Sequence, residues 1–198
     1  MDYYERKDEF IELLRSRLDE ERFIHSLNVA SAAEELAVLF DADRKKAYIA
    51  GLLHDCTKNE TREMQLKYFS DNDIILSQVE RNNPKLWHAM TAPLYAKNVL
   101  GIEDEEMLLS LRFHTTGRSG MGLMEKIIYI ADYISAERDY PDVGVMRRLS
   151  AISLDKAALY SLKYSLSSLS KRELLIHPDS LSFYNELILN GTKTEELQ

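Results

Sequence analysis

Two polar residues follow an apolar helical segment near the end of the first quarter of the chain. Residues 50–53, Ala-Gly-Leu-Leu, lead directly into His54 and Asp55, and Lys58 follows one turn later. Burying an imidazole and a carboxylate without partners is costly. One metal ion would satisfy both groups, since an imidazole nitrogen with a carboxylate oxygen suits Zn, Fe, Mn or Ni better than Ca.

Two other apolar segments carry polar residues of the same types. His25 extends the apolar face formed by Val29, Ala32 and Ala33. Asp132 interrupts a run that is otherwise suited to full burial, and no Lys or Arg shares its face, so its carboxylate requires a cation. Metal sites in helical bundles are built from side chains on facing helices. Together, His25, His54, Asp55 and Asp132, with His88 and His114 at helix edges, predict a metal site.

The pattern along the whole chain predicts an all-α fold that positions these residues. The 198 residues include only seven glycines and four prolines, and helical periodicity recurs where period-2 alternation is rare. We treat residues 1–198 as a single domain with a frayed acidic tail at about 191–198. Expected helices cover about 4–18, 20–40, a segment capped by Asp43, one beginning at 61, then 74–79, 87–101, 104–113, 123–135, 154–169 and 178–189.

Bulk composition excludes several classes of function. The net charge of -8 disfavours general affinity for nucleic acid or an anionic membrane. The single Cys56 excludes an internal disulfide, no apolar run reaches the ~20 residues of a membrane span, and the first residues do not resemble a signal peptide. We therefore expect a cytoplasmic protein that acts on small molecules, and the sequence leaves open whether it forms a homodimer.

Several motifs together resemble a known family. The order of His25, His54-Asp55 and Asp132 looks like the HD-domain metal-dependent phosphohydrolases. Within them, the match is closer to the YqeK family of diadenosine tetraphosphate hydrolases, and it covers about residues 10–190. The segments that carry it are Leu52–Asp55 with Lys58, Trp87–Ala89 with Pro93, Phe113–Gly117, and Ile127–Ile134 followed by Arg138.

This resemblance implies an HD-domain helical bundle with a transition metal, most often iron, between its core helices. Mn, Co, Ni and Zn are alternatives, one ion is favoured, and a second is allowed. The resemblance also implies symmetric cleavage of diadenosine tetraphosphate into two ADP. Its implied metal ligands are the residues at positions 25, 54, 55 and 132.

The same resemblance, with general chemistry, suggests roles for further residues. Asp132 is expected to orient or deprotonate the attacking water, and Lys58 to stabilise charge that develops on phosphate. His88 and His114 are expected to act in catalysis, to contact phosphate, or to hold a second metal. The expected substrate-binding residues are His88, His114, Thr115, Thr116, Gly117, Arg118 and Arg138.

Two alternatives remain open at this point. The site could belong to another HD nucleotide phosphohydrolase, namely a nucleotide phosphatase, a cyclic-nucleotide phosphodiesterase or an alarmone hydrolase. The chain could also be a nucleotide-sensing HD module without turnover, although a sensor has no need for the full set of His54, Asp55, Asp132 and Lys58. Product analysis over a panel of nucleotides would separate these alternatives.

Overall fold

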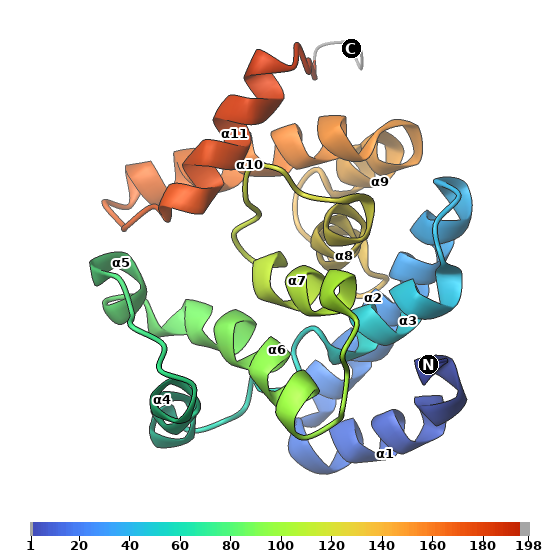
Figure 1. Ribbon diagram of the computed structural model, residues 1–198. Coiled ribbons are helices and arrows are strands. Elements are labelled where there is room, and N and C mark those ends of the chain that lie inside the picture. Colours follow the sequence, from blue (N-terminus) through green and yellow to red (C-terminus); the bar gives the residue numbers. More distant parts are fainter. Residues whose placement is uncertain (1, 195–198) are drawn as a thin grey trace.

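Helices α2 (Glu20–Leu39), α3 (Arg44–Leu53) and α8 (Leu123–Ile134) form the centre of the structure, a computed structural model that describes residues 2–194 (Figure 1). Gly51 allows α2 and α3 to approach closely, because a Cβ atom there would lie 2.9 Å from the Cα of Ala30. This close packing brings the end of α3 against Val29, Ala30 and Ala33 in the middle of α2, about one turn after His25.

Acidic N-caps set the starts of the helices that carry the site. The carboxylate of Asp19 accepts a hydrogen bond from the backbone N–H of Arg22 at the start of α2, and Asp43 accepts from two N–H groups at the start of α3. Such caps satisfy N–H groups that have no partner within the helix. The Asp43 cap predicted from the sequence is therefore confirmed.

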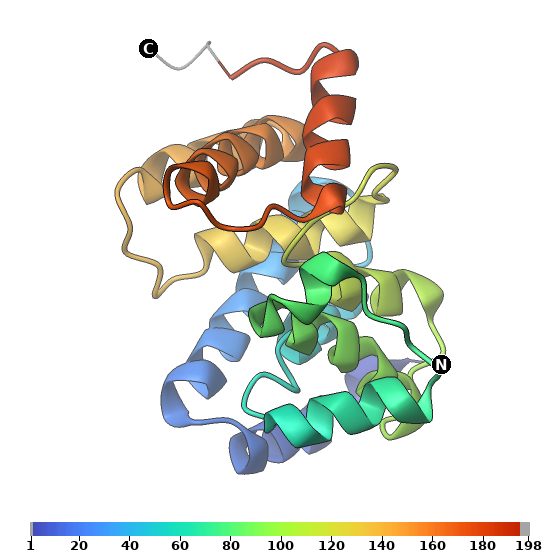
Figure 2. The same cartoon turned by 90° about the vertical axis from the view of Figure 1, so that its left-hand side faces the viewer.

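The remaining helices surround this centre, and α9–α11 stack over α8 on the side opposite α1 (Figure 2). In residues 2–194 the structure contains no strand, which confirms the all-α prediction. These helices are η1 (Tyr3–Arg6), α1 (Lys7–Arg17), α4 (Arg62–Asp71), α5 (Gln78–Arg81), η2 (Pro84–Leu86), α6 (Trp87–Asn98), α7 (Glu105–Phe113), α9 (Val143–Ile152), α10 (Leu154–Lys171) and α11 (Pro178–Leu189).

The structure corrects two helix assignments. The helix expected at 74–79 is wrong, because Ser77 and Glu80 form a capping box that starts α5 at Gln78. Helix α9 was not expected. It follows Asp142, which has a positive φ of 73°, and it buries Met146 and Leu149.

The tail expected at about 191–198 lies in part outside the described residues. Helix α11 ends at Leu189, and the residues after Gly191 that the structure describes are in no helix, while 195–198 lie outside the described residues. None of the helices in the described part of the chain is both long and apolar enough to cross a lipid bilayer.

Candidate metal centre

The predicted metal ligands converge from α2, the end of α3, and α8. The Nε2 atom of His25 lies 3.2 Å from Nε2 of His54 and 3.1 Å from Oδ1 of Asp132, and Nε2 of His54 lies 3.5 Å from Oδ2 of Asp55. Two donor atoms about 2.1 Å from one ion lie about 3.0 Å apart at a right angle and about 3.4 Å apart at the tetrahedral angle. The spacing therefore fits ligands of a shared ion.

Backbone contacts determine which nitrogen of two histidines is free. The Nδ1 of His54 donates to the carbonyl of Gly51 at 2.7 Å, and the Nδ1 of His114 donates to the carbonyl of Leu111 at 2.8 Å. Because the protons are on Nδ1, both Nε2 atoms present lone pairs to the cluster. Burial also lowers the pKa of His54 to about 3, so this imidazole is a neutral ligand at physiological pH.

A carboxylate outside the cluster holds His25. The side chain of Glu137 contacts Nδ1 of His25, and it is itself held by Ser135 Oγ at 2.7 Å and Asn28 Nδ2 at 2.8 Å. Burial opposes protonation of His25, but Asp132 and Glu137 outweigh burial and raise its pKa. A proton or a metal ion can therefore occupy the position between Nε2 and Asp132. Such outer carboxylates orient the histidine ligands of many metal sites.

Asp55 supplies an independent test of whether these residues fit a metal. Its side chain is 2% exposed, and its Oδ1 atom is buried with no hydrogen-bond partner among the described residues, whereas Oδ2 contacts Arg22 Nη1 at 2.9 Å. Burial opposes ionisation of Asp55, but the surrounding imidazoles outweigh it and hold its pKa well below the usual range. A buried, ionised oxygen without a donor is the environment that a cation would complete. The residues fit a metal.

Asp132 lies at the edge of the cluster. Arg138 contacts its carboxylate through Nη2 and its backbone carbonyl through Nε, the latter at 2.7 Å. Burial opposes ionisation, but the hydrogen bond with His25 and the guanidinium of Arg138 lower the pKa of Asp132 below its ordinary value. Asp132 is therefore an anion whose Oδ1 atom contacts both His25 and Arg138.

His88 and His114 form a second set of ligands around the other oxygen of Asp55. Their Nε2 atoms lie 3.1 Å and 3.5 Å from Asp55 Oδ1, and 3.2 Å from one another. Lys58 Nζ lies 3.1 Å from His88 Nε2 and 3.7 Å from Asp55 Oδ1. Asp55 therefore stands between two groups of potential ligands, His25 with His54 on one side and His88 with His114 on the other.

Helix ends and one side-chain bond position this second set. His114 is the residue that ends α7, and His88 lies in the first turn of α6. The hydroxyl of Thr57, three residues after His54, donates to the backbone carbonyl of His88 at 3.1 Å. The His-Asp segment is thus tied directly to the helix that carries the second set.

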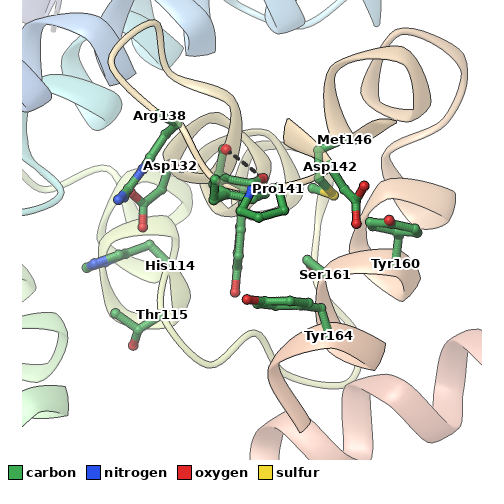
Figure 3. A pocket seen from close by; sticks show the side chains of 12 residues that line it. His114, Thr115, Asp132, Arg138, Pro141, Asp142, Met146, Tyr160, Ser161 and Tyr164 are labelled. Atoms are coloured by element: carbon green, nitrogen blue, oxygen red, sulfur yellow. Dashed lines mark hydrogen bonds and ion pairs between the residues drawn. The ribbon is translucent and has the colours of Figure 1, made fainter. Parts of the chain in front are cut away.

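A cavity of about 370 Å³ opens beside the cluster (Figure 3). The labelled side chains of His114, Thr115, Asp132 and Arg138 lie on one side of it, and those of Asp142, Met146 and Tyr160 on the other. The hydroxyl of Thr115 is shielded from solvent and has no hydrogen-bond partner within residues 2–194. The residues that line the cavity are His114, Thr115, Asp132, Tyr133, Arg138, Tyr140, Pro141, Asp142, Met146, Tyr160, Ser161 and Tyr164.

One wall of this cavity is a loop between α8 and α9, residues 135–142, which also contributes to the metal centre. Glu137 and Arg138 contact the metal-ligand residues, whereas Tyr140, Pro141 and Asp142 line the cavity. Arg147 of α9 holds the loop by donating to the carbonyls of residues 134, 135 and 138 at 3.1, 2.9 and 3.3 Å.

The structure brings some predicted substrate-binding residues to the cavity and holds others elsewhere. His114, Thr115 and Arg138 line it, and His88 lies beside His114. Arg118 instead donates to both carboxylate oxygens of Glu125, at 2.7 and 2.9 Å.

The two residues between Thr115 and Arg118 have contacts of their own. The hydroxyl of Thr116 donates to the carbonyl of Gly117 at 2.9 Å. Gly117 has a positive φ of 61°, and a Cβ there would lie 2.5 Å from the ring of Phe183. Among the described residues, the lining of the cavity does not include 116–118.

Sequence reasoning missed several residues that surround the site. Arg22 and Glu137 hold Asp55 and His25, and tyrosines form part of the cavity wall. Arg22 lies three residues before His25 on the same helix, a spacing that places both on one face. Glu137 and the tyrosines have no such signal, because their contacts depend on a loop whose path the sequence does not reveal.

Comparison with known proteins decides the family. The HD-domain profile matches residues 22–137, a segment that contains His25, His54, Asp55 and Asp132. The chain belongs to the HD-domain family. This confirms the resemblance that was inferred from the motifs.

Proteins similar along most of the chain narrow the relationship. A symmetrical bis(5'-nucleosyl)-tetraphosphatase of Bacillus subtilis is 36% identical over 92% of this chain and 97% of the relative. The protein of the same name from Halalkalibacterium halodurans is 38% identical over 90% and 95%, respectively. A crystal structure of a predicted HD superfamily hydrolase involved in NAD metabolism from Clostridium acetobutylicum superposes with a TM-score of 0.90 at 36% identity, covering 93% of this chain and 97% of that one.

Proposed function

We propose that this HD-domain protein hydrolyses diadenosine tetraphosphate symmetrically into two ADP at the His25–Asp132 cluster. The observation that carries the proposal is the convergence of imidazole nitrogens of His25, His54, His88 and His114 on the carboxylates of Asp55 and Asp132. The relatives that match this chain over most of its length are named symmetrical bis(5'-nucleosyl)-tetraphosphatases, which supports a dinucleoside tetraphosphate as the substrate. The choice of adenosine rests on the family resemblance. The expected place of action is the cytoplasm.

The metal completes the site. His25, His54, Asp55 and Asp132 would hold a divalent transition ion, which supplies Lewis acidity toward a phosphoryl oxygen and a lowered pKa for bound water. Iron is the ion we propose, on the family resemblance. The second set of imidazoles, around Asp55 Oδ1, would be able to hold a second ion.

The chain's own residues bind the polyphosphate, orient the attacking water and neutralise the charge of the phosphate oxygens. The carboxylate of Asp132 lies where it can accept a proton from the attacking water, with Arg138 holding its orientation. Lys58, beside His88, and Arg138, at the cavity edge, supply positive charge for the negative oxygens of the polyphosphate. The unpaired hydroxyl of Thr115 is available to donate to a phosphate oxygen.

The test is product analysis with metal-loaded protein. Protein loaded with Fe or Mn is incubated with diadenosine tetraphosphate, and the products are separated by ion-exchange chromatography. ADP as the sole product supports symmetric cleavage, whereas AMP plus ATP would show that a different bond is broken. A matched Asp132→Asn protein should be inactive, and full activity in that variant would remove Asp132 from the mechanism.

The alternatives predict different results in the same experiment. Another HD phosphohydrolase would leave diadenosine tetraphosphate intact and cleave a nucleotide monoester, a cyclic nucleotide or an alarmone from the panel. A sensing module would bind ADP without turning over any of these compounds.

A further inference from the structure

The cavity beside the metal centre has two chemically different ends. At the metal end, Arg138 lies beside Asp132, Thr115 lies next to His114, and these polar groups suit phosphate oxygens. At the far end stand Tyr160, Tyr164 and Met146, and here the lining is mostly apolar. A ligand that fills the cavity is therefore charged at one end and flat and apolar at the other.

The far end suits a nucleoside. Tyr164 is 60% exposed on α10, which is unusual for so large a side chain, and Figure 3 shows its ring directed toward the cavity. Tyrosine rings with a free face stack with bases without regard to sequence. Met146, which is buried and lies beside Asp142, adds a polarisable, adaptable side chain to the cavity lining.

Asp142 places a carboxylate at this far end. It precedes α9 but does not cap it through its side chain, and its backbone has a positive φ of 73°, a conformation that non-glycine residues seldom adopt. Backbone strain of this kind clusters at ligand sites. The Asp142 carboxylate already interacts with the hydroxyl of Tyr160. Its other acceptor positions can accept hydrogen bonds from an amino group of the base or a hydroxyl of the ribose.

We propose that the far end of this cavity binds one nucleoside of the substrate, and that the second nucleoside is not required for cleavage. The inference rests on the proposed function and refines its substrate class to nucleoside 5'-tetraphosphates with one recognised end. At about 370 Å³ the cavity lies near the lower limit of ligand pockets, about 300–1,000 Å³, which suits one nucleoside rather than two.

This one-ended recognition makes adenosine 5'-tetraphosphate a substrate. Water adds to one of the two central phosphorus atoms, the oxygen bridge between them breaks, and the departing diphosphate retains the bridging oxygen. The products are ADP and pyrophosphate, with protons released according to pH. No oxidant, reductant or further reactant is needed.

The first test compares the two substrates on the metal-loaded enzyme. We expect adenosine 5'-tetraphosphate to give ADP and pyrophosphate with a KM within about threefold of that for diadenosine tetraphosphate, because the recognised end is identical. If diadenosine tetraphosphate is hydrolysed and the mononucleoside compound is not, recognition requires both ends and the proposal is wrong.

The second test measures binding and does not depend on turnover. Isothermal titration of metal-loaded protein with ADP should show at least a tenfold weaker Kd for Tyr164→Ala than for the wild type, with pyrophosphate binding unchanged. The matched control is Ile152→Ala on α9, whose side chain is 59% exposed and lies outside the cavity lining. Equal ADP affinity in wild type and Tyr164→Ala would overturn the proposal.

A third comparison identifies what Asp142 recognises. If it contacts the ribose, 2'-deoxy-ADP binds the wild type more weakly than ADP, and Asp142→Asn reduces that difference. If Asp142 contacts the base, inosine diphosphate binds the wild type more weakly than ADP, and Asp142→Asn reduces that difference. An Asp142→Asn protein that binds all three ligands as the wild type does would remove Asp142 from the proposal.

These outcomes separate the inference from the proposed function. A protein that hydrolyses no tetraphosphate but binds ADP in a Tyr164-dependent way would refute the hydrolase and leave the nucleoside site standing. A protein that hydrolyses diadenosine tetraphosphate but binds ADP independently of Tyr164 would support the hydrolase and refute the nucleoside site.

Discussion

The metal centre and the far end of the cavity differ in how their side chains are held. At the metal centre, imidazoles are oriented by a second contact, such as His54 by Gly51 and His25 by Glu137. At the far end, Tyr164 is largely exposed and Asp142 does not cap its helix. Metal ligation demands fixed donor atoms, whereas stacking tolerates a mobile surface, so the two ends of one substrate can be recognised by regions of different rigidity.

The largest effect is expected from removing the carboxylate of Asp55, which both sets of ligands share. Asp55→Asn should lower turnover by about 1,000-fold or more, beyond the ~10–100-fold typical of an outer contact, because it removes an anionic ligand. Metal content by mass spectrometry should fall in parallel. Asp71→Asn, at an exposed ion pair with Lys67, is the control and should retain both properties. Normal metal content in Asp55→Asn would contradict a ligand role.

The next change loosens a fixed ligand without removing it. Glu137→Gln should weaken metal affinity by about 10–100-fold, because the amide orients His25 less strongly than a carboxylate does. Competition with a chromophoric chelator measures this directly. The exposed Glu12→Gln on α1 should leave affinity unchanged, and unchanged affinity in Glu137→Gln as well would mean that His25 needs no outer contact.

A smaller effect is expected where the two regions meet. Thr115→Val removes the unpaired hydroxyl and keeps the shape, so the enzyme should lose one hydrogen bond to phosphate, worth about 0.5–1.5 kcal/mol, or about 2–13-fold in kcat/KM. Metal content should not change. A variant with wild-type kinetics would show that this hydroxyl does not contact the substrate.

The smallest effect concerns the cavity wall. Tyr140→Phe removes the hydrogen bond that the hydroxyl donates to the carbonyl of Tyr133 at 3.0 Å, which should lower the free energy of unfolding at pH 7 by about 0.5–1.5 kcal/mol. Urea denaturation measures it.

This effect should depend on pH. Burial raises the pKa of Tyr140 to about 12, above its ordinary value near 10. The folded state therefore favours the protonated phenol, and its contribution is complete below pH 10 and lost as the pH rises through 12. The stability advantage over Tyr140→Phe should shrink between these values, and a constant difference up to pH 12 would contradict the raised pKa.

The sequence predicted that the polar residues of the candidate metal centre come together between the core helices, because its signals for them are local. His25, His54 and Asp132 stand out as polar residues on apolar helix faces, where burial without a cation would be costly. The core helices were equally visible, since Asp19 and Asp43 cap them and their apolar stripes are long. The structure brings these residues together.

The far end of the cavity left no comparable signal. Stacking tyrosines have the spacing of packing residues, and α9 begins after a strained Asp142 that no propensity identifies. Arg118 illustrates the opposite error: an arginine in a polar loop suggests phosphate binding, but tertiary packing supplies Glu125 as its partner. Contacts made by loops depend on the path of the backbone, and that path is set by the whole fold.

The loop at residues 135–142 has a thermodynamic consequence. Glu137 on this loop supports a metal ligand, and Tyr140 lines the nucleoside cavity. If binding of the metal or of the nucleotide orders the loop, the other ligand then binds without the free-energy cost of ordering it. Such coupling is reciprocal: if the metal tightens nucleotide binding by some factor, the nucleotide tightens metal binding by the same factor. The enzyme would then retain its ion most strongly while a nucleotide occupies it, and Arg147, which clamps the loop to α9, would set the size of that cooperativity.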